Sequence, residues 1–323
     1  MLNITMTNME KIQLCQEIVN QIQAESMRPV CRLRLTGEPF EITDCHLGGV
    51  PYVPHNEQIP ADKDGNQLWL CAQINFAQMP PVDGFPVAGL LQIFLEDWHF
   101  GDFGLEDGPF PPQDYWKAVY YSQIDDTVTM EECEAKMAVP WAEAKRSNMP
   151  RQAHRFDRDD IEKGYDRLWR CPNVPLKVSF QCVEQEGVND EDFRFDELFA
   201  AAMKTRLPDA DPEEFMPYNL DDDTPEEREA LRKIRDQIQN GGCKMGGYPS
   251  YLQDDPRLYD EGEGWAECDT LLLQLYDDTY HYPQEGIGGM DLALNGGPIN
   301  FVIRAEDLKR QDFSRVLAQW ACT

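Results

Sequence analysis

The sequence predicts a β-rich α+β fold: one domain built from two related β units, with a helical and acidic segment inserted between them. Two observations predict it. A short glycine–proline motif occurs twice, each time ahead of apolar strands, and most helix-forming patterns lie between the two copies. We expect an N-terminal helix in 1–27, the first β unit in 28–128, the insertion in 129–240 and the second β unit in 241–323.

The chain begins with a helix and a strand. Residues 8–25 place Cys15, Ile18 and Val19 at the spacing of one helix face. Residues 28–36 alternate between apolar and polar side chains, which predicts a strand.

Three helix patterns mark the inserted segment. Residues 129–132 (TMEE) form a capping box, in which a threonine and a glutamate three residues later satisfy free backbone amides. Residues 190–204 also have a helical pattern. The clearest helix start is Thr224, an N-cap that Pro225 follows, and this helix ends at Gly241.

The repeated motif reads LGGVPY at 47–52 and MGGYPS at 245–250. Each copy is followed by an apolar strand with one glutamine, Gln73 in the first copy and Gln274 in the second, and then by a further apolar strand. These four strands are 68–74, 89–95, 271–275 and 297–303. Matches in the same order predict a duplicated β unit.

The glycines and prolines of the motif predict a structural turn. Glycine supplies a positive φ or room for another backbone, and proline then fixes an extended exit. The turn residues are Gly48, Gly49, Pro51, Gly246, Gly247 and Pro249.

The order of these motifs resembles that of the YwqG-like family of bacterial proteins. The resemblance is carried by the two Gly-Gly-x-Pro turns, GLLQIFL at 89–95, GGYPSYLQ at 246–253, LLLQL at 271–275 and Asp-Leu-x-x-x-x-Phe at 307–313. It covers most of the chain and departs at 58–60 (QIP), where the family tends to have Trp-Pro. The resemblance implies a β-rich α+β fold and a domain of unknown function without established catalytic residues. Some relatives lie near toxin–immunity genes, which implies an interaction role.

Acidic residues dominate the charge of the chain. It has 29 Lys and Arg against 59 Asp and Glu, a net charge of −30. Such a surface repels phosphate backbones and anionic lipid, so we expect neither nucleic-acid nor membrane binding. Residues 184–229 hold 17 acidic and 4 basic side chains, and residues 254–278 hold 9 and 1. These blocks are solvated surface, a surface for a basic protein partner, or a cation site.

Leader and cysteine patterns predict a cytoplasmic protein. The first residues are polar rather than a secretory leader, and no apolar run is long enough to span a bilayer. The ten cysteines are scattered without a C-x-x-C pair, which predicts reduced and mostly buried thiols.

Four glutamines are candidate ligand-binding residues: Gln73, Gln92, Gln253 and Gln274. A glutamine in a buried strand must find hydrogen-bond partners. Gln73 and Gln274 therefore either form structural bonds between the β units or contact a ligand at a cleft on their pseudo-twofold axis.

Carboxylates offer two candidate metal sites. Asp277 and Asp278 could hold a divalent cation in that cleft. Residues 62–66 (DKDGN) begin like an EF-hand loop, but Gln67 and Gln73 stand where the loop needs a glycine and a closing glutamate. That segment is therefore a polar turn or a nonstandard weak cation site.

Other catalytic patterns are absent from the sequence. There is no G-x-S-x-G elbow, phosphate-binding glycine loop or H-E-x-x-H pair. A zinc site would have to combine distant residues, such as Cys45, His46 and His281. We predict no cofactor.

Three functional hypotheses follow. The first is a noncatalytic binding protein whose acidic surface contacts a basic partner, for instance as an immunity-type protein. The second is a hydrolase with a carboxylate-held divalent metal. The third is a small-ligand binder at the cleft between the β units.

Overall fold

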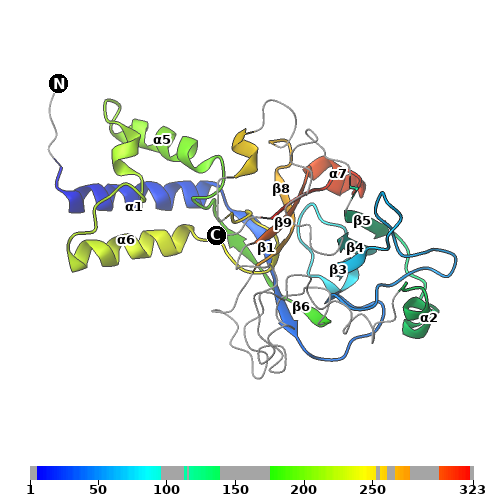
Figure 1. The fold of residues 1–323 in the computed structure, drawn as a ribbon. Coiled ribbons are helices and arrows are strands. Elements are labelled where there is room, and N and C mark those ends of the chain that lie inside the picture. The colour runs from blue at the N-terminus through cyan, green and yellow to red at the C-terminus, as the bar shows by residue number, and fades with distance from the viewer. Residues whose placement is uncertain are drawn as a thin grey trace, which may run out of the picture.

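A β-sheet that curls into a half-barrel forms the centre of the protein (Figure 1). The computed structural model describes residues 6–95, 113–114, 116–138, 175–251, 255–259, 266–276 and 298–320. Ten strands of these residues join into one sheet in which every pairing is antiparallel. A β-rich α+β fold is therefore confirmed.

The strands and helices have the following bounds. The strands are β1 (Arg28–Thr36), β2 (His46–Leu47), β3 (Trp69–Asn75), β4 (Leu90–Leu95), β5 (Trp116–Tyr121), β6 (Leu176–Glu186), β7 (Lys244–Gly246), β8 (Thr270–Leu275), β9 (Ile299–Ile303) and β10 (Leu317–Trp320). The helices are α1 (Asn8–Glu25), α2 (Met130–Ala135), α5 (Phe195–Arg206), α6 (Pro225–Ile238) and α7 (Ala305–Arg310), with short 3₁₀ turns η1 (Phe76–Gln78), η5 (Pro212–Phe215) and η6 (Pro256–Tyr259).

The strand order places β1 beside a strand from the later part of the chain and β6 beside a strand from the earlier part. The sheet runs β10-β9-β8-β7-β1-β6-β2-β3-β4-β5, so β1 and β6 form its centre. We call β2–β5 the first flank and β7–β10 the second flank. β1 pairs with the second flank, through β7, although it precedes the first flank in sequence. β6 correspondingly pairs with the first flank, through β2.

The central pairing is symmetric around Arg34, beyond a register shift between Cys31 and Leu33. Arg34 lies opposite Ser179, and the adjacent pairs are Leu33 with Phe180 and Leu35 with Val178. The attachment to each flank also matches. The Val178 amide donates to the carbonyl oxygen of Cys45 just before β2, at 2.8 Å, and the Leu33 amide donates to that of Cys243 just before β7, at 2.9 Å.

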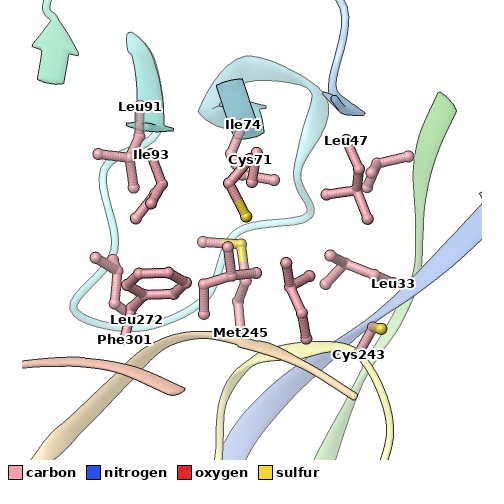
Figure 2. Packing of buried hydrophobic residues seen from close by; sticks show 14 of the residues in the cluster. Leu33, Leu47, Cys71, Ile74, Leu91, Ile93, Cys243, Met245, Leu272 and Phe301 are labelled. Atoms are coloured by element: carbon pink, nitrogen blue, oxygen red, sulfur yellow. The ribbon is translucent and has the colours of Figure 1, made fainter. Parts of the chain in front are cut away.

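The core lies between the inner faces of the two flanks (Figure 2). Leu91 and Ile93 of β4 face Leu272 of β8 and Phe301 of β9. All four side chains are 0% exposed. Burying an aliphatic or aromatic side chain of this size contributes about 1.5–3 kcal/mol relative to leaving it exposed. The flanks therefore stabilise each other.

A second core belongs to α1, α5, η5 and α6, which we call the helical lobe. The lobe lies on one side of the molecule, away from β3–β5 (Figure 1). Its buried residues include Ile18, Phe199 and Ile234, one from each long helix. The sequence expectations are confirmed here, because α1 matches 8–25 and the Thr224 capping box opens α6.

The expected helical insertion contains a strand that the sequence reading missed. Residues 176–186 form β6, within the segment 129–240 that was expected to be helical. Leu176, Val178 and Glu186 are the buried residues of β6, charged residues lie near both of its ends, and its central partner β1 is far away in sequence. The helices α5 and α6 follow β6 and precede β7, so in sequence they lie between the two strands that flank β1 in the sheet. No helix in the described ranges is long and apolar enough to cross a membrane.

The two Gly-Gly-x-Pro turns have the positive φ that the sequence predicted. Gly48 and Gly49 have φ of 61° and 84°, and Gly246 and Gly247 have φ of 75° and 68°. A Cβ on Gly246 would lie 2.5 Å from the carbonyl oxygen of Pro29 in β1. Glycine is therefore required there both for its conformation and for the close approach of the central strand.

The first prediction tests this approach. Gly246→Ala should lower the free energy of unfolding by about 3 kcal/mol, because a strained φ and an overpacked contact add together. Gly65→Ala is the matched control: Gly65 has φ of 87° but no atom within 4 Å of the added Cβ, so about 1 kcal/mol of strain is expected. Urea denaturation measures both losses, and equal losses would contradict the contact with β1.

Candidate functional site

In each flank, two buried amide side chains lie opposite each other on neighbouring strands. Gln73 of β3 lies opposite Gln92 of β4, and Gln274 of β8 lies opposite Asn300 of β9. All four are 0% exposed. Both strand pairs carry a register irregularity three residues before the glutamine, which begins at Leu70 in one flank and at Leu271 in the other, so the amides occupy matching positions.

In the first flank the amides bind the segment that follows the glycine turn. The Tyr52 amide donates to Gln73 Oε1 at 2.9 Å, and Gln92 Nε2 donates to the same oxygen at 2.7 Å. Gln92 Nε2 also donates to the Tyr52 carbonyl at 2.8 Å. Gln73 Nε2 donates to the carbonyls of Ile42 and Asp44. These bonds hold the turn against its own flank.

The second flank repeats this arrangement with different residues. The Ser250 amide donates to Gln274 Oε1 at 2.7 Å, and Asn300 Nδ2 donates to the Ser250 carbonyl at 2.8 Å. Gln274 Nε2 donates to the Gly242 carbonyl at 2.8 Å. To contact a ligand, Gln73 or Gln274 would have to give up backbone partners. Of the other sequence candidates, Gln253, Asp277 and Asp278 lie outside the described residues.

The flanks differ at the residue opposite each glutamine. His46 in β2 pairs with Gln73, and Lys244 in β7 pairs with Gln274. The His46 ring stacks on Phe40 at 4.3 Å, and its Nδ1 is 2.7 Å from the Gly48 carbonyl. Burial lowers the pKa of His46 to about 4. The imidazole is therefore neutral at physiological pH, with Nδ1–H donating to the carbonyl.

Lys244 is part of a buried charge network that the sequence reading did not identify. Its Nζ is fully buried and donates to Glu186 Oε1 at 2.7 Å and to the Asn240 carbonyl at 2.5 Å. Burial lowers the pKa of Lys244 to about 8, and the Glu186 carboxylate opposes that shift. The other Glu186 oxygen binds Arg32 of β1 at 3.1 Å.

The network continues into the segment after β7. The Tyr248 amide donates to Glu186 Oε1 at 2.9 Å. The Ser250 hydroxyl and the Tyr251 amide both donate to one oxygen of Glu191, each at 2.5 Å. Burial raises the pKa of Glu191, while these two hydrogen bonds oppose the rise. The network therefore joins the loop after β6 to the second glycine turn.

A second buried cluster lies beside this network. Arg257 of η6 binds Asp192 at 3.0 Å and Asp255 at 2.6 Å, and all three side chains are at most 1% exposed. Arg257 also stacks on Phe193 at 4.7 Å from the ring centroid. The guanidinium thus has two carboxylate partners. We call residues 187–243, between β6 and β7, the lobe segment, and the cluster connects the start of this segment to η6.

In both clusters the buried charges are paired. Their cations and carboxylates contact one another, which a buried charge requires. Across the parts of the chain that the structure describes, no group of three or more His, Cys, Asp or Glu is placed to hold a metal ion. The Asp62 turn is closed on itself, because its carboxylate accepts from the amides of Asp64 and Asn66 and from the Asn66 side chain.

A family model described as a domain of unknown function, DUF1963, matches residues 45–322. The chain belongs to this family. The YwqG-like resemblance of the motif order is consistent with it. No curated protein matches the chain. The matched span begins just before β2, so α1 and β1 lie outside it, although β1 is a central strand of the sheet.

The second prediction tests the buried network. Lys244→Met should lower the free energy of unfolding by about 3–5 kcal/mol, because Glu186 is left buried with one cation fewer. Lys233→Met removes an exposed lysine whose nearest carboxylate, on Glu229, is 3.5 Å away, so stability should hardly change. Urea denaturation at pH 7 compares the two variants. A small loss for Lys244→Met would mean that the network does not hold the glycine turn and the lobe segment together.

Proposed function

We propose that this member of the family is a cytoplasmic, noncatalytic protein-binding module that presents its acidic helical lobe to a basic partner protein. The surface of the lobe supports this proposal. Its exposed carboxylates in residues 195–238 are Asp196, Glu197, Asp209, Asp211, Glu213, Glu214, Asp221, Asp222, Asp223, Glu226, Glu229 and Asp236. An acidic surface speeds encounter with a basic partner and makes the association sensitive to salt.

Ion pairs within the lobe neutralise only some of these carboxylates. Arg232 binds Glu229 and Asp236 of its own helix, at 3.0 Å and 2.6 Å. By contrast, the carboxylates of Asp209 and Asp221 make no ion pair with a described residue. The loops before and after η5 therefore carry uncompensated negative charge.

The lobe is also held firmly against the sheet. Gln23 of α1 donates to the Val188 carbonyl, and Asn240 after α6 donates to the Gly187 carbonyl at 2.7 Å. The Tyr248 hydroxyl in the second glycine turn donates to the Ser26 carbonyl at 2.6 Å. A lobe fixed in this way loses little conformational freedom on binding, which favours affinity.

The matching geometry of the flanks supports a further part of the proposal. We infer that β1–β5 and β6–β10 are two copies of one β unit, with the lobe helices α5 and α6 inserted after the first strand of the second copy. The lobe is then an addition to a duplicated scaffold, and an immunity-type role against a basic, toxin-like protein is one form of the proposed function. The metal-hydrolase and cleft-ligand hypotheses gain no supporting observation among the described residues.

The third prediction tests the acidic surface. We expect the full-length protein to capture a basic partner from lysate of its native host at low salt and to release it at high salt, because the attraction is screened. The lobe variant Asp209→Lys, Asp221→Lys and Asp223→Lys should lose this partner. Affinity capture with mass spectrometry measures the recovered proteins.

The matched control has the same change of charge at exposed residues of the first β unit, by Glu38→Lys, Asp83→Lys and Asp126→Lys. It should retain the partner. A partner that survives the lobe variant, or the absence of any salt-sensitive partner, would contradict the proposal.

A further inference from the structure

His55 lies in the loop after the first Gly-Gly-x-Pro turn, and both of its ring nitrogens contact oxygen atoms. Nδ1 is 2.8 Å from Glu132 Oε1 of α2. Nε2 is 3.0 Å from the Thr127 hydroxyl oxygen and 3.6 Å from Asp125 Oδ2, both in the turn before α2. The imidazole therefore joins the loop of the first flank to α2 and to the turn that precedes it.

The hydrogen bonds around His55 require a proton on each ring nitrogen. A carboxylate oxygen can only accept, so Nδ1 carries the hydrogen in the contact with Glu132. The Thr127 hydroxyl donates its single hydrogen to Asp125 Oδ1 at 2.6 Å, so its oxygen accepts from Nε2. His55 is therefore an imidazolium cation between the carboxylates of Glu132 and Asp125.

Contacts with the same loop hold α2 in place. Lys136 Nζ donates to the Pro54 carbonyl at 2.7 Å and to the Val53 carbonyl at 3.3 Å. The Val53 amide donates to Cys133 Sγ, also at 3.3 Å. α2 has six residues, and so short a helix is not stable on its own. Its position therefore depends on these side-chain contacts and on the contact between Glu132 and His55.

Two carboxylates and one lysine share this interface with His55. Asp125 and Glu132 contact the imidazole, and Lys136 Nζ is 3.5 Å from Glu132 Oε1. In the loop itself, the Glu57 side chain makes a hydrogen bond with Tyr121 of β5. When His55 loses one proton, Lys136 is the cation that remains beside the two carboxylates among the described residues of this interface.

We propose that His55 is a pH-dependent switch that holds α2 against the first flank while its imidazole is protonated. Cys133 of α2 packs in a buried apolar cluster with Tyr52 of the loop and Phe94 of β4. When the imidazole is neutral, α2 has one charged contact fewer and uncovers this cluster more often. The switch is separate from the acidic surface of the lobe, so it does not depend on the proposed partner.

The charges set the pH range in which the switch holds α2. The hydrogen bond from His55 is the largest cause that lowers the pKa of Glu132. A lowered carboxyl pKa adds stability that is present at neutral pH and is lost as the pH falls through the lowered value. The imidazolium adds stability in acid that is lost as the pH rises from about 6.5 upward. α2 is therefore held most firmly between these ranges, at about pH 5.5.

Amide hydrogen exchange of the full-length protein measures how often α2 opens. The amides of Cys133, Lys136 and Met137 report on it, because each donates to a carbonyl of α2 or of its N-cap. Their protection, corrected for the intrinsic effect of pH on exchange, should fall about fivefold between about pH 5.5 and about pH 8.5. The amides of β3 in the same sample provide the reference and should keep their protection.

Three variants assign the switch. His55→Gln should show at both pH values the low protection that the wild type has at high pH, and Glu132→Gln should remove most of the pH dependence as well. Glu131→Gln is the matched control, because Glu131 is an exposed carboxylate of the same helix turn without an ion pair to a described residue. It should keep the wild-type pH dependence. The proposal is overturned if wild-type α2 is equally protected at both pH values, if His55→Gln keeps the wild-type pH dependence, or if Glu131→Gln loses it as fully as Glu132→Gln.

Discussion

The antiparallel pairing of β1 with β6 is the constraint on which the rest of the structure depends. Each of these strands is attached to the flank that lies on the other side of the pairing, β1 to β7 and β6 to β2. Neither flank is therefore complete with strands from its own part of the chain. Leu91 of the first flank and Phe301 of the second flank pack in one cluster, so the main core exists only when both parts are present.

The two flanks share one set of glutamine hydrogen bonds and differ in the residue beside it. Gln73 and Gln274 both hold the backbone of the residue after a Gly-Gly-x-Pro turn. Opposite this glutamine, the first flank has a neutral His46, whereas the second has Lys244 paired with Glu186. The Lys244 network reaches Asn240 at the end of the lobe segment. The difference between the flanks thus coincides with the attachment of the helical lobe, which carries the acidic surface.

The sequence predicted elements whose signals are local. The β3, β4, β8 and β9 strands, the α1 and α6 helices and the positive φ of the paired glycines follow from apolar runs, capping residues and turn chemistry. The prediction for 129–240 does not include β6, although residues 176–182 alternate apolar and polar side chains, and the partner strand β1 is remote in sequence. The sequence predicts that Gln73 and Gln274 need hydrogen-bond partners. It does not show that these partners are backbone atoms of the same flank. Lys244 belongs to no sequence motif predicted above, although an alignment of the two glycine motifs that starts one residue earlier places it opposite His46.

The position of β1 has a consequence for the order of events during synthesis. β1 leaves the ribosome before its neighbours β6 and β7, which lie on the order of 140 and 200 residues later. At about 5–20 residues per second, the first of them is made roughly 7–30 s after β1. Throughout that interval, β1 has none of the neighbouring strands that flank it in the finished sheet. The sheet consequently assembles late, and contacts so distant in sequence favour slow folding.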